Sequence, residues 1–335
     1  MEQSLVTLSN TVACRWCTPL TGYDDVISDF GNRFKDDLWT ILKYDVTTDE
    51  WCEQLQRKVR HIQVVERDVA ANAALPQYQV DLCIVTALPK PELAAVLDLP
   101  WSWSPFDRAH DTTNYYVGHY QKAGNAVKVV AASAPRMGMP AAGVLSMKMI
   151  EYFRPRYLAM AGILAGMRGG SEPGDIVVAD PSWDYGSGKR ARKDGKSLFA
   201  AEPHQIALDP FLRAKFQKMS QDKNIFDDIR KSYSGSSNIK SVLSMKVGPV
   251  GSGAAVIADA TVTDEVLMQH RKLVGIEMEA YGVFAAGREC TLPQPKVFAL
   301  KSVCDFGDEE KNYSWQHYAA FTSAQALRIF VEKYL

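Results

Sequence analysis

Short apolar runs alternate with helical segments along most of the chain, and this alternation limits the folds open to it. Near-continuous apolar runs at Val80–Thr86, Tyr157–Gly162 and Val297–Val303 are typical of strands that are covered on both faces. Helices are predicted after such runs, over 141–152, 280–288 and 315–334. Because strand–helix alternation favours parallel strands, the sequence predicts an α/β fold with a mostly parallel mixed sheet flanked by helices.

The remaining expected elements fit the same pattern. They are a hairpin over 115–120 and 126–132, strands over 175–179 and 274–277, and helices over 91–97, 210–217 and 261–269. Residues 70–77 are small and weakly patterned, which indicates a domain boundary. We therefore expect a short α/β N-terminal appendage over 1–75, with a strand at 37–44 and a helix at 47–64, followed by a main domain over 80–335.

Composition excludes several classes of protein. The chain has 335 residues, 47% of them hydrophobic and 23% charged, with a formal net charge of −1. Such a balance is ordinary for a soluble enzyme and predicts neither nucleic acid nor a membrane as partner. The first residues lack the basic and apolar regions of a secretory leader, so we expect a cytoplasmic protein.

The six cysteines do not form a recognisable metal site. Cys14 and Cys17 have the spacing of half a zinc site, but the sequence holds no second such pair. Cys83 and Cys304 lie in apolar runs, where a reduced thiol acts as a small hydrophobe. We therefore predict no metal and no cofactor.

Three acids are the main candidates for chemistry. Glu277 and Glu279 flank Met278, and Asp305 ends the apolar run that begins at Val297. A carboxylate can bind both hydroxyls of a ribose, and a carboxylic acid can protonate a purine ring nitrogen so that the base leaves neutral. The alternatives are that both glutamates are first-turn acids of the helix over 280–288, and that Asp305 caps a loop.

Two basic features are candidates for binding anions. Arg136 lies in a strand-to-helix loop with a glycine, which suits phosphate, although a surface salt bridge is the alternative. Residues 187–196 carry five cations, among them Lys189 and Arg190. This stretch is either a solvated loop or a lid that closes on a polyanionic substrate.

Taken in order, these and other motifs resemble those of the superfamily of purine nucleoside phosphorylases and methylthioadenosine/S-adenosylhomocysteine nucleosidases, from about Val80 to Leu335. The opening strand, two glycine turns, a strand entry, a base-holding segment, a ribose motif and a terminal acid all have counterparts. They are Ile84–Leu88, Arg136–Met139, Ala161–Gly166, Gly174–Asp180, Ser252–Ile257, Glu277–Ala280 and Asp305.

The resemblance implies a role for each matching residue. Asp305 would protonate the purine N7 as the general acid, Glu279 would bind the ribose hydroxyls, and Met278 would pack on the sugar. Glu92 lies near the position of the family's water-positioning glutamate. Val256 and Ile257 would line the base pocket, Lys301 stands where nucleosidases carry a basic residue, and Gly162 belongs to the second glycine turn. The family is usually homo-oligomeric and needs no cofactor.

Departures from the family pattern favour water over phosphate as nucleophile. Ile163 replaces a serine that contacts phosphate in phosphorylases, and Leu158–Met160 stands where phosphorylases carry an arginine. Glu92 comes one residue late, after Pro91. We therefore expect hydrolysis of a purine N-glycosidic bond; a phosphorylase that uses Arg136 and a non-catalytic nucleotide-sensing module are the alternatives.

The basic stretch suggests a substrate that carries phosphates. With it, the chain is similar to nucleosidase effectors of bacterial anti-phage defence, which strip adenine from ATP-like nucleotides. In some of these a receiver domain precedes the catalytic one, and residues 42–64 resemble a receiver's last strand and helix. The resemblance implies an appendage derived from a receiver.

Overall fold

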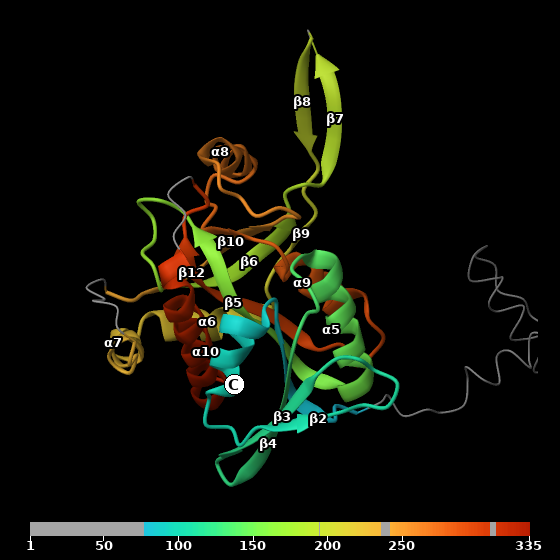
Figure 1. The fold of residues 1–335 in the computed structure, drawn as a ribbon, viewed down its shortest axis with the longest axis vertical. Coiled ribbons are helices and arrows are strands. Elements are labelled where there is room, and N and C mark those ends of the chain that lie inside the picture. Colours follow the sequence, from blue (N-terminus) through green and yellow to red (C-terminus); the bar gives the residue numbers. More distant parts are fainter. Residues whose placement is uncertain (1–76, 194, 236–241, 309–312) are drawn as a thin grey trace, which may run out of the picture. The chain divides into compact units, whose positions relative to one another are not determined.

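The fold was analysed in a computed structural model, which describes residues 77–193, 195–235, 242–308 and 313–335 (Figure 1). The appendage expected over 1–75 and its receiver-like elements lie outside these residues. The strands are β1 (Val80–Thr86), β2 (Ser104–Phe106), β3 (Tyr115–Lys122), β4 (Asn125–Ser133), β5 (Pro155–Gly166), β6 (Ile176–Asp184), β7 (Gly188–Lys193), β8 (Lys196–Ala201), β9 (Gln205–Ile206), β10 (Met245–Ser252), β11 (Gly275–Glu277) and β12 (Lys296–Asp305).

Helices connect most of these strands. They are η1 (Pro89–Leu93), α4 (Ala94–Leu97), α5 (Met139–Phe153), α6 (Pro210–Ser220), α7 (Lys223–Lys231), α8 (Ala260–Gln269), α9 (Ala280–Glu289), η2 (Tyr313–Trp315) and α10 (Gln316–Lys333). None of the helices in the described part of the chain combines the length and hydropathy needed to cross a lipid bilayer.

The main sheet is mixed, as the sequence predicts. Its strands lie in the order β11-β10-β6-β12-β5-β1-β4-β3-β2, with β9 beside β6. At its centre β1 pairs in parallel with β4 and β5, and β12 pairs in parallel with β5. Because β11 pairs with both β10 and β5, the strands β11, β10, β6, β12 and β5 close into a ring.

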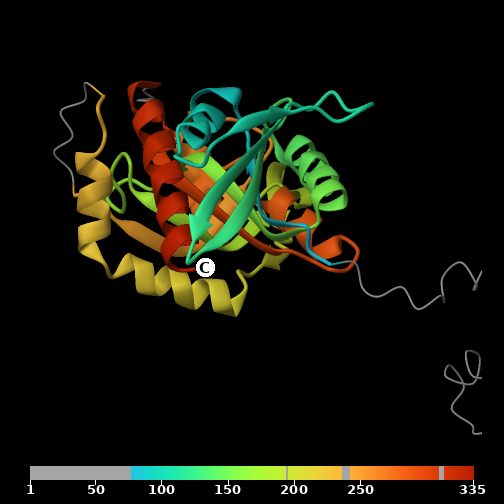
Figure 2. The ribbon, with the colours of Figure 1, turned by 90° about the horizontal axis from the view of Figure 1, so that it is seen from below.

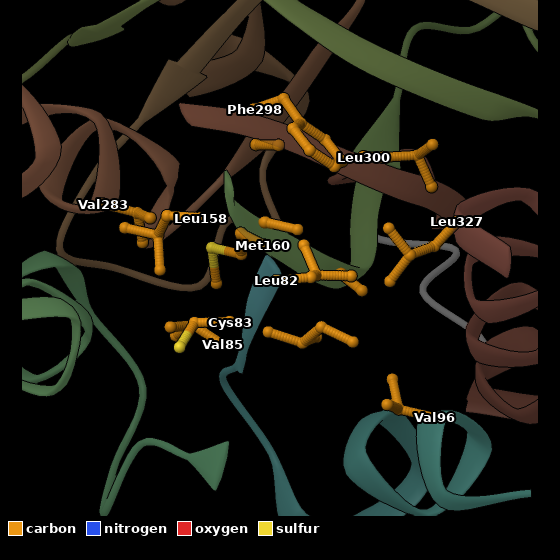
Figure 3. Close-up of a cluster of buried hydrophobic side chains, with 14 of the residues drawn as sticks. Leu82, Cys83, Val85, Val96, Leu158, Met160, Val283, Phe298, Leu300 and Leu327 are labelled. Atoms are coloured by element: carbon orange, nitrogen blue, oxygen red, sulfur yellow. The ribbon is translucent and has the colours of Figure 1, made fainter. Parts of the chain in front are cut away.

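Helices cover the sheet on both faces. Helix α10 packs against β12 and β5, whereas α5 and α9 pack against each other on the opposite side (Figures 1 and 2). In the core, Leu300 lies toward Leu327 of α10, and Leu158 lies beside Val283 of α9 (Figure 3). Burial on both faces explains why these strands read as continuous apolar runs.

Close contact between α5 and α9 depends on small residues. A Cβ atom added to Gly282 of α9 would lie 2.5 Å from the carbonyl oxygen of Met139, at the start of α5. Because that oxygen belongs to the backbone, no side-chain rotation could relieve the overlap. Gly282 therefore lets the starts of the two helices approach.

The basic stretch forms regular secondary structure instead of an irregular loop. Residues 188–193 and 196–201 form the antiparallel hairpin β7–β8, which projects from the rest of the fold (Figure 1). The sequence carries a signal for it, since an Asp-Gly pair such as 194–195 favours a two-residue hairpin turn, and Gly195 has a φ of +75°. Strand β10 and helix α7 are further elements that the sequence analysis did not predict.

Candidate active site

A cavity of about 310 Å³ opens at the carboxyl ends of the central strands. It is lined by four acids that come from three segments of the chain, Glu92, Glu277 with Glu279, and Asp305. Its apolar walls come from Leu88, Met137, Ile163 to Ala165, Ala255 to Ile257, Ile276 and Met278. Acids and apolar walls that converge in a cavity of this size are typical of a small-molecule site.

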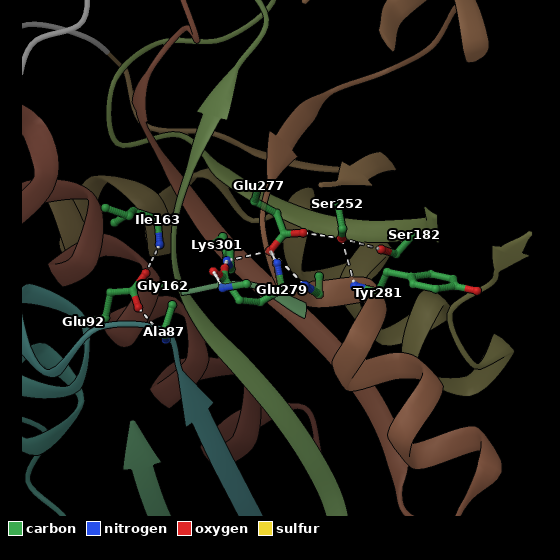
Figure 4. Close-up of polar contacts among 12 residues, drawn as sticks. Ala87, Glu92, Gly162, Ile163, Ser182, Ser252, Glu277, Glu279, Tyr281 and Lys301 are labelled. Atoms are coloured by element: carbon green, nitrogen blue, oxygen red, sulfur yellow. Dashed lines mark hydrogen bonds and ion pairs between the residues drawn. The ribbon is translucent and has the colours of Figure 1, made fainter. Parts of the chain in front are cut away.

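Lys301 holds two of the acids together. Its Nζ donates hydrogen bonds of 2.7 Å to Glu277 Oε2 and of 2.7 Å to Glu279 Oε2 (Figure 4). All three side chains are almost completely buried. Burial by itself would lower the pKa of Lys301, but the carboxylates of Glu277 and Glu279 raise it above its ordinary value. The lysine is therefore a fixed cation behind the two glutamates.

The carboxylate oxygens of Glu277 accept hydrogen bonds from other groups of the protein. Oε2 also accepts the backbone N–H groups of Glu279 and Ala280, at 2.8 Å and 2.9 Å, and Oε1 accepts the hydroxyl of Ser252 (Figure 4). Burial would raise the pKa of the Glu277 carboxyl, but Lys301 and these donors hold it below its usual value. Glu277 thus stabilises the start of α9, as the alternative reading of the sequence expected.

Glu279 keeps acceptor capacity for a ligand. Its Oε1 accepts the N–H of Gly138 at 2.9 Å, and its Oε2 accepts Lys301. Two carboxylate oxygens offer about four lone-pair sites, so about two stay open toward the cavity. The bond to Gly138 exists because Gly282 lets the starts of α5 and α9 approach. The packing of two helices thus orients this carboxylate.

Strand β11 ends at Glu277, and the chain enters helix α9 within three residues. Glu279 stands at the N-cap of α9, and Met278 lines the cavity beside both glutamates. Met278 and both glutamates therefore line the same cavity, because the chain turns from strand to helix between them.

Glu92 is buried beneath β5. Its Oε2 accepts the N–H groups of Ala87 and Leu88, at 2.7 Å and 2.8 Å, and its Oε1 accepts the N–H of Ile163 at 2.9 Å (Figure 4). Burial raises the pKa of the Glu92 carboxyl to about 7, although Lys301 opposes the shift. A carboxyl that titrates near neutrality can exchange a proton at the pH of a cell.

Gly162 makes room for Glu92. A Cβ atom at residue 162 would lie 2.2 Å from Glu92 Oε1. Gly162 does not line the cavity. Its missing side chain lets the Glu92 carboxylate approach β5 closely enough to accept the N–H of Ile163.

Asp305 reaches the cavity through a bulge in β12. Val303 pairs with Leu164, but Asp305 pairs with Ala165, so Cys304 is an extra residue in the strand. A bulge of this kind re-aims side chains, and both Cys304 and Asp305 line the cavity. Asp305 Oδ1 accepts the N–H of Gly307 at 3.0 Å, and Cys304 Sγ lies 3.4 Å from Oδ2.

Of the other predicted site residues, some line this cavity and others lie elsewhere in the fold. Val256, which is 52% exposed, and the buried Ile257 line it. Arg136 is exposed and lines a second, neighbouring cavity. Lys189 and Arg190 lie on the hairpin β7–β8 and line neither cavity.

Sequence reasoning missed Ser252 and Gly138 as partners of the glutamates. The hydroxyl of Ser252 also accepts the N–H of Tyr281 at 2.9 Å, so it helps to close the first turn of α9. Ser252 begins the motif Ser252–Ile257, which resembles the family's base-holding segment, and Gly138 belongs to the glycine turn Arg136–Met139. Both motifs were visible, but no local pattern indicates that they bond residues more than 20 positions away.

Comparisons with known proteins identify the family to which the chain belongs. A family model described as the phosphorylase superfamily matches residues 81–335. The chain is 30% identical over 292 residues to the uncharacterized protein y4jS of Sinorhizobium fredii, a match that covers 85% of this chain and 70% of that protein.

Two other relatives are named as ATP nucleosidases. The chain is 24% identical over 279 residues to ATP nucleosidase Cap17 of Escherichia coli, which covers 78% of this chain and 53% of that protein. It is 25% identical over 256 residues to a death domain-containing ATP nucleosidase of Amphimedon queenslandica, which covers 70% and 45%. The chain thus spans about half the length of these two proteins.

Solved structures share the fold. The methylthioadenosine/S-adenosylhomocysteine nucleosidase of Helicobacter pylori superposes with a TM-score of 0.60 at 15% identity, over 77% of this chain and 100% of that one. The futalosine hydrolase of the same organism superposes with a TM-score of 0.60 at 16% identity, over 76% and 98%. With the family model covering most of the sequence, the chain belongs to the phosphorylase superfamily.

Proposed function

We propose that the chain hydrolyses the N-glycosidic bond of a purine nucleoside or nucleotide, with adenine nucleotides of the ATP type as the favoured substrates. One observation carries the proposal: Asp305, Glu279 and Glu92, far apart in the sequence, line a single cavity of about 310 Å³. The likeness to proteins named as ATP nucleosidases supports the choice of substrate.

Each acid has a distinct part in the reaction. Asp305 gives a proton to N7 of the purine, and the bond between N9 and the anomeric carbon breaks with its electron pair going to the base. Glu279 holds the ribose hydroxyls with its remaining lone pairs, and Met278 packs against the sugar. Preorganised carboxylates beside a cationic sugar stabilise the transition state without reorganisation.

Water completes the reaction. Glu92 uses three of its roughly four lone-pair sites on backbone N–H groups, which leaves one for a water molecule. As that water attacks the anomeric carbon, Glu92 accepts its proton. The products are the free purine and a ribose, or ribose phosphate, with a hydroxyl at the anomeric carbon.

The lining of the cavity favours water over phosphate. Among the described residues that line it, no lysine or arginine is present, and Ile163 stands where phosphorylases carry serine. Among the described residues that line the cavity, a phosphate nucleophile would therefore find no cation to bind it. Arg136, the candidate for a phosphorylase, lines the other cavity.

Release of free base tests the proposal. Purified protein is incubated with adenosine, methylthioadenosine, AMP, ATP and dATP, with and without phosphate, and the products are separated by chromatography. Asp305→Asn should lower the rate by about 10²–10⁴, the range for loss of a general acid, whereas Glu265→Gln, which changes an exposed acid on α8, should leave it unchanged. Equal rates for Asp305→Asn and the unmodified protein would contradict the role.

The same assay separates the alternatives. Ribose 1-phosphate formed only when phosphate is added would identify a phosphorylase. Tight nucleotide binding without base release would identify a sensing module. A role in anti-phage defence and a homo-oligomeric state remain predictions from the resemblance, to be tested by phage challenge and by light scattering.

A further inference from the structure

A second cavity of about 450 Å³ lies at the start of helix α5. Its polar and charged lining includes Thr113, Asn114, Ser133, Arg136 and Lys148. The mechanism proposed above uses none of these residues.

The two cavities share their walls. Three pairs of consecutive residues each place one member in either cavity. The members that line the active-site cavity are Leu88, Glu92 and Met137. Their chain neighbours Pro89, Leu93 and Arg136 line the second cavity. Consecutive Cα atoms are only about 3.8 Å apart, so a single thickness of chain separates the cavities. Met137 is 47% exposed and Arg136 is also exposed, so both lie at the mouths of the cavities.

The two cavities differ in charge. The active-site cavity is lined by four acids and, among the described residues, by no lysine or arginine. The second cavity is lined by Arg136 and Lys148 and, within the same described part of the chain, by no acid. A purine riboside needs carboxylates for its hydroxyls and ring nitrogen, and its phosphates need cations. The pair of cavities therefore matches the two halves of a nucleotide.

Lys148 is positioned to donate. Its Nζ bonds to Thr113 Oγ1 at 2.7 Å and to the carboxylate of Asp111. An ammonium group has three protons, so these two bonds fix the head group and leave one proton for an anion. Asp111, the ion-pair partner of this lysine, does not line the cavity.

The N-terminus of helix α5 adds positive potential to the second cavity. Pro140 and Ala141, in the first turn of this 15-residue helix, line the same cavity. The positive end of a helix dipole favours negative charge there. Asn114 and Ser133 add neutral groups that can hydrogen-bond phosphate oxygens.

We propose that the second cavity binds the 5′-polyphosphate of a nucleotide whose ribose and purine occupy the active-site cavity, with Arg136 and Lys148 as the phosphate-binding cations. This inference rests on the proposed nucleosidase function and deepens it: the substrate is a nucleoside polyphosphate, and these two residues select it over the nucleoside. Arg136 thus binds the phosphates of the substrate and supplies no phosphate nucleophile.

Comparing two substrates on one variant tests the inference. Arg136→Gln should lower kcat/KM for ATP about tenfold, which corresponds to the loss of one charge-assisted hydrogen bond, and should leave kcat/KM for adenosine within about twofold. Lys148→Gln should do the same, with adenosine as the internal check on folding. The matched control is Arg156→Gln, an exposed arginine at the opposite end of β5, which should alter neither value.

Inorganic tripolyphosphate provides a probe without a purine. It should inhibit the cleavage of ATP competitively and do so more weakly in Arg136→Gln. If kcat/KM of Arg136→Gln falls equally for ATP and adenosine, or changes for neither, the inference is overturned. Base release by the unmodified protein would still uphold the nucleosidase function. If the unmodified protein releases no base from any substrate, the nucleosidase function is refuted. Calorimetry of ATP binding then tests the phosphate site by itself. Weaker binding of ATP by Arg136→Gln than by the unmodified protein would support the site, and equal binding would refute it.

Discussion

Replacing Lys301 by methionine removes the cation that bonds both Glu277 and Glu279. The side chains of these three residues are 1–4% exposed, so solvent cannot take over the role of the ammonium group. Methionine has a similar length and fills the same space, so the change tests charge and not volume.

The expected loss of stability is large. Removing one partner of a buried ion pair leaves an uncompensated charge and costs about 3–5 kcal/mol. For a domain of this size that lowers Tm by roughly 10 °C. Lys296→Met is the matched control, because Lys296 lies on the same strand β12 and pairs with Asp209, but its side chain is 45% exposed. An exposed pair contributes at most about 1 kcal/mol.

The contribution of Glu277 to the pH dependence of stability should also change direction. In the unmodified protein the pKa of Glu277 is held below its ordinary value, so its contribution to stability is present above about pH 4.3 and is lost as the pH falls through the lower folded value. Without Lys301, burial raises this pKa instead. The folded variant then binds protons more tightly than the unfolded chain, so it gains stability as the pH falls from 8 toward 5.

Urea unfolding followed by circular dichroism at pH 8 and pH 5 measures both effects. A loss in Lys301→Met no larger than that in Lys296→Met would refute the reasoning. So would a gain in stability from pH 8 to pH 5 that is no larger in Lys301→Met than in the unmodified protein, in which burial already raises the pKa of Glu92. Either result would mean that the glutamates do not need the lysine.

Two further predictions concern Glu92. Because burial raises its pKa to about 7 and a base must be deprotonated, kcat/KM should fall about tenfold per pH unit below pH 7; a flat profile between pH 5 and 7 would exclude Glu92 as the base. Gly162→Ala places a Cβ 2.2 Å from Glu92 Oε1 and should lower kcat roughly 100-fold through misplacement of the base. The control Gly170→Ala, with its nearest atom at 3.4 Å, should keep full activity, and equal activities of the two variants would show that Glu92 needs no clearance.

The α/β class and the central strands could be predicted because burial on both faces leaves a local mark. Strands β1, β5 and β12 are continuous apolar runs, and the helices between them follow the expected spacing. Asp305 could be located for the same reason, since it follows a buried strand and the carboxyl ends of parallel strands meet at one edge.

The partners of the acids could not be predicted, because each contact joins residues far apart in sequence. Lys301 reaches Glu277 and Glu279 across 24 and 22 positions, and Gly162 lies 70 positions from the Glu92 carboxylate that it accommodates. A one-residue bulge at Cys304 likewise depends on the pairing of β12 with β5.

The amino-acid order by itself therefore determined the fold class and indicated Glu277, Glu279 and Asp305 as candidates, since both follow from local apolar runs and from the residues that end them. Glu92 was indicated by the family resemblance alone. Only the tertiary structure decided which acids are saturated by protein donors, which keep lone pairs for a ligand, and where Arg136 lies. Those outcomes depend on distances of about 3 Å between chain segments, and such distances exist only after the sheet has closed and the helices have packed against it.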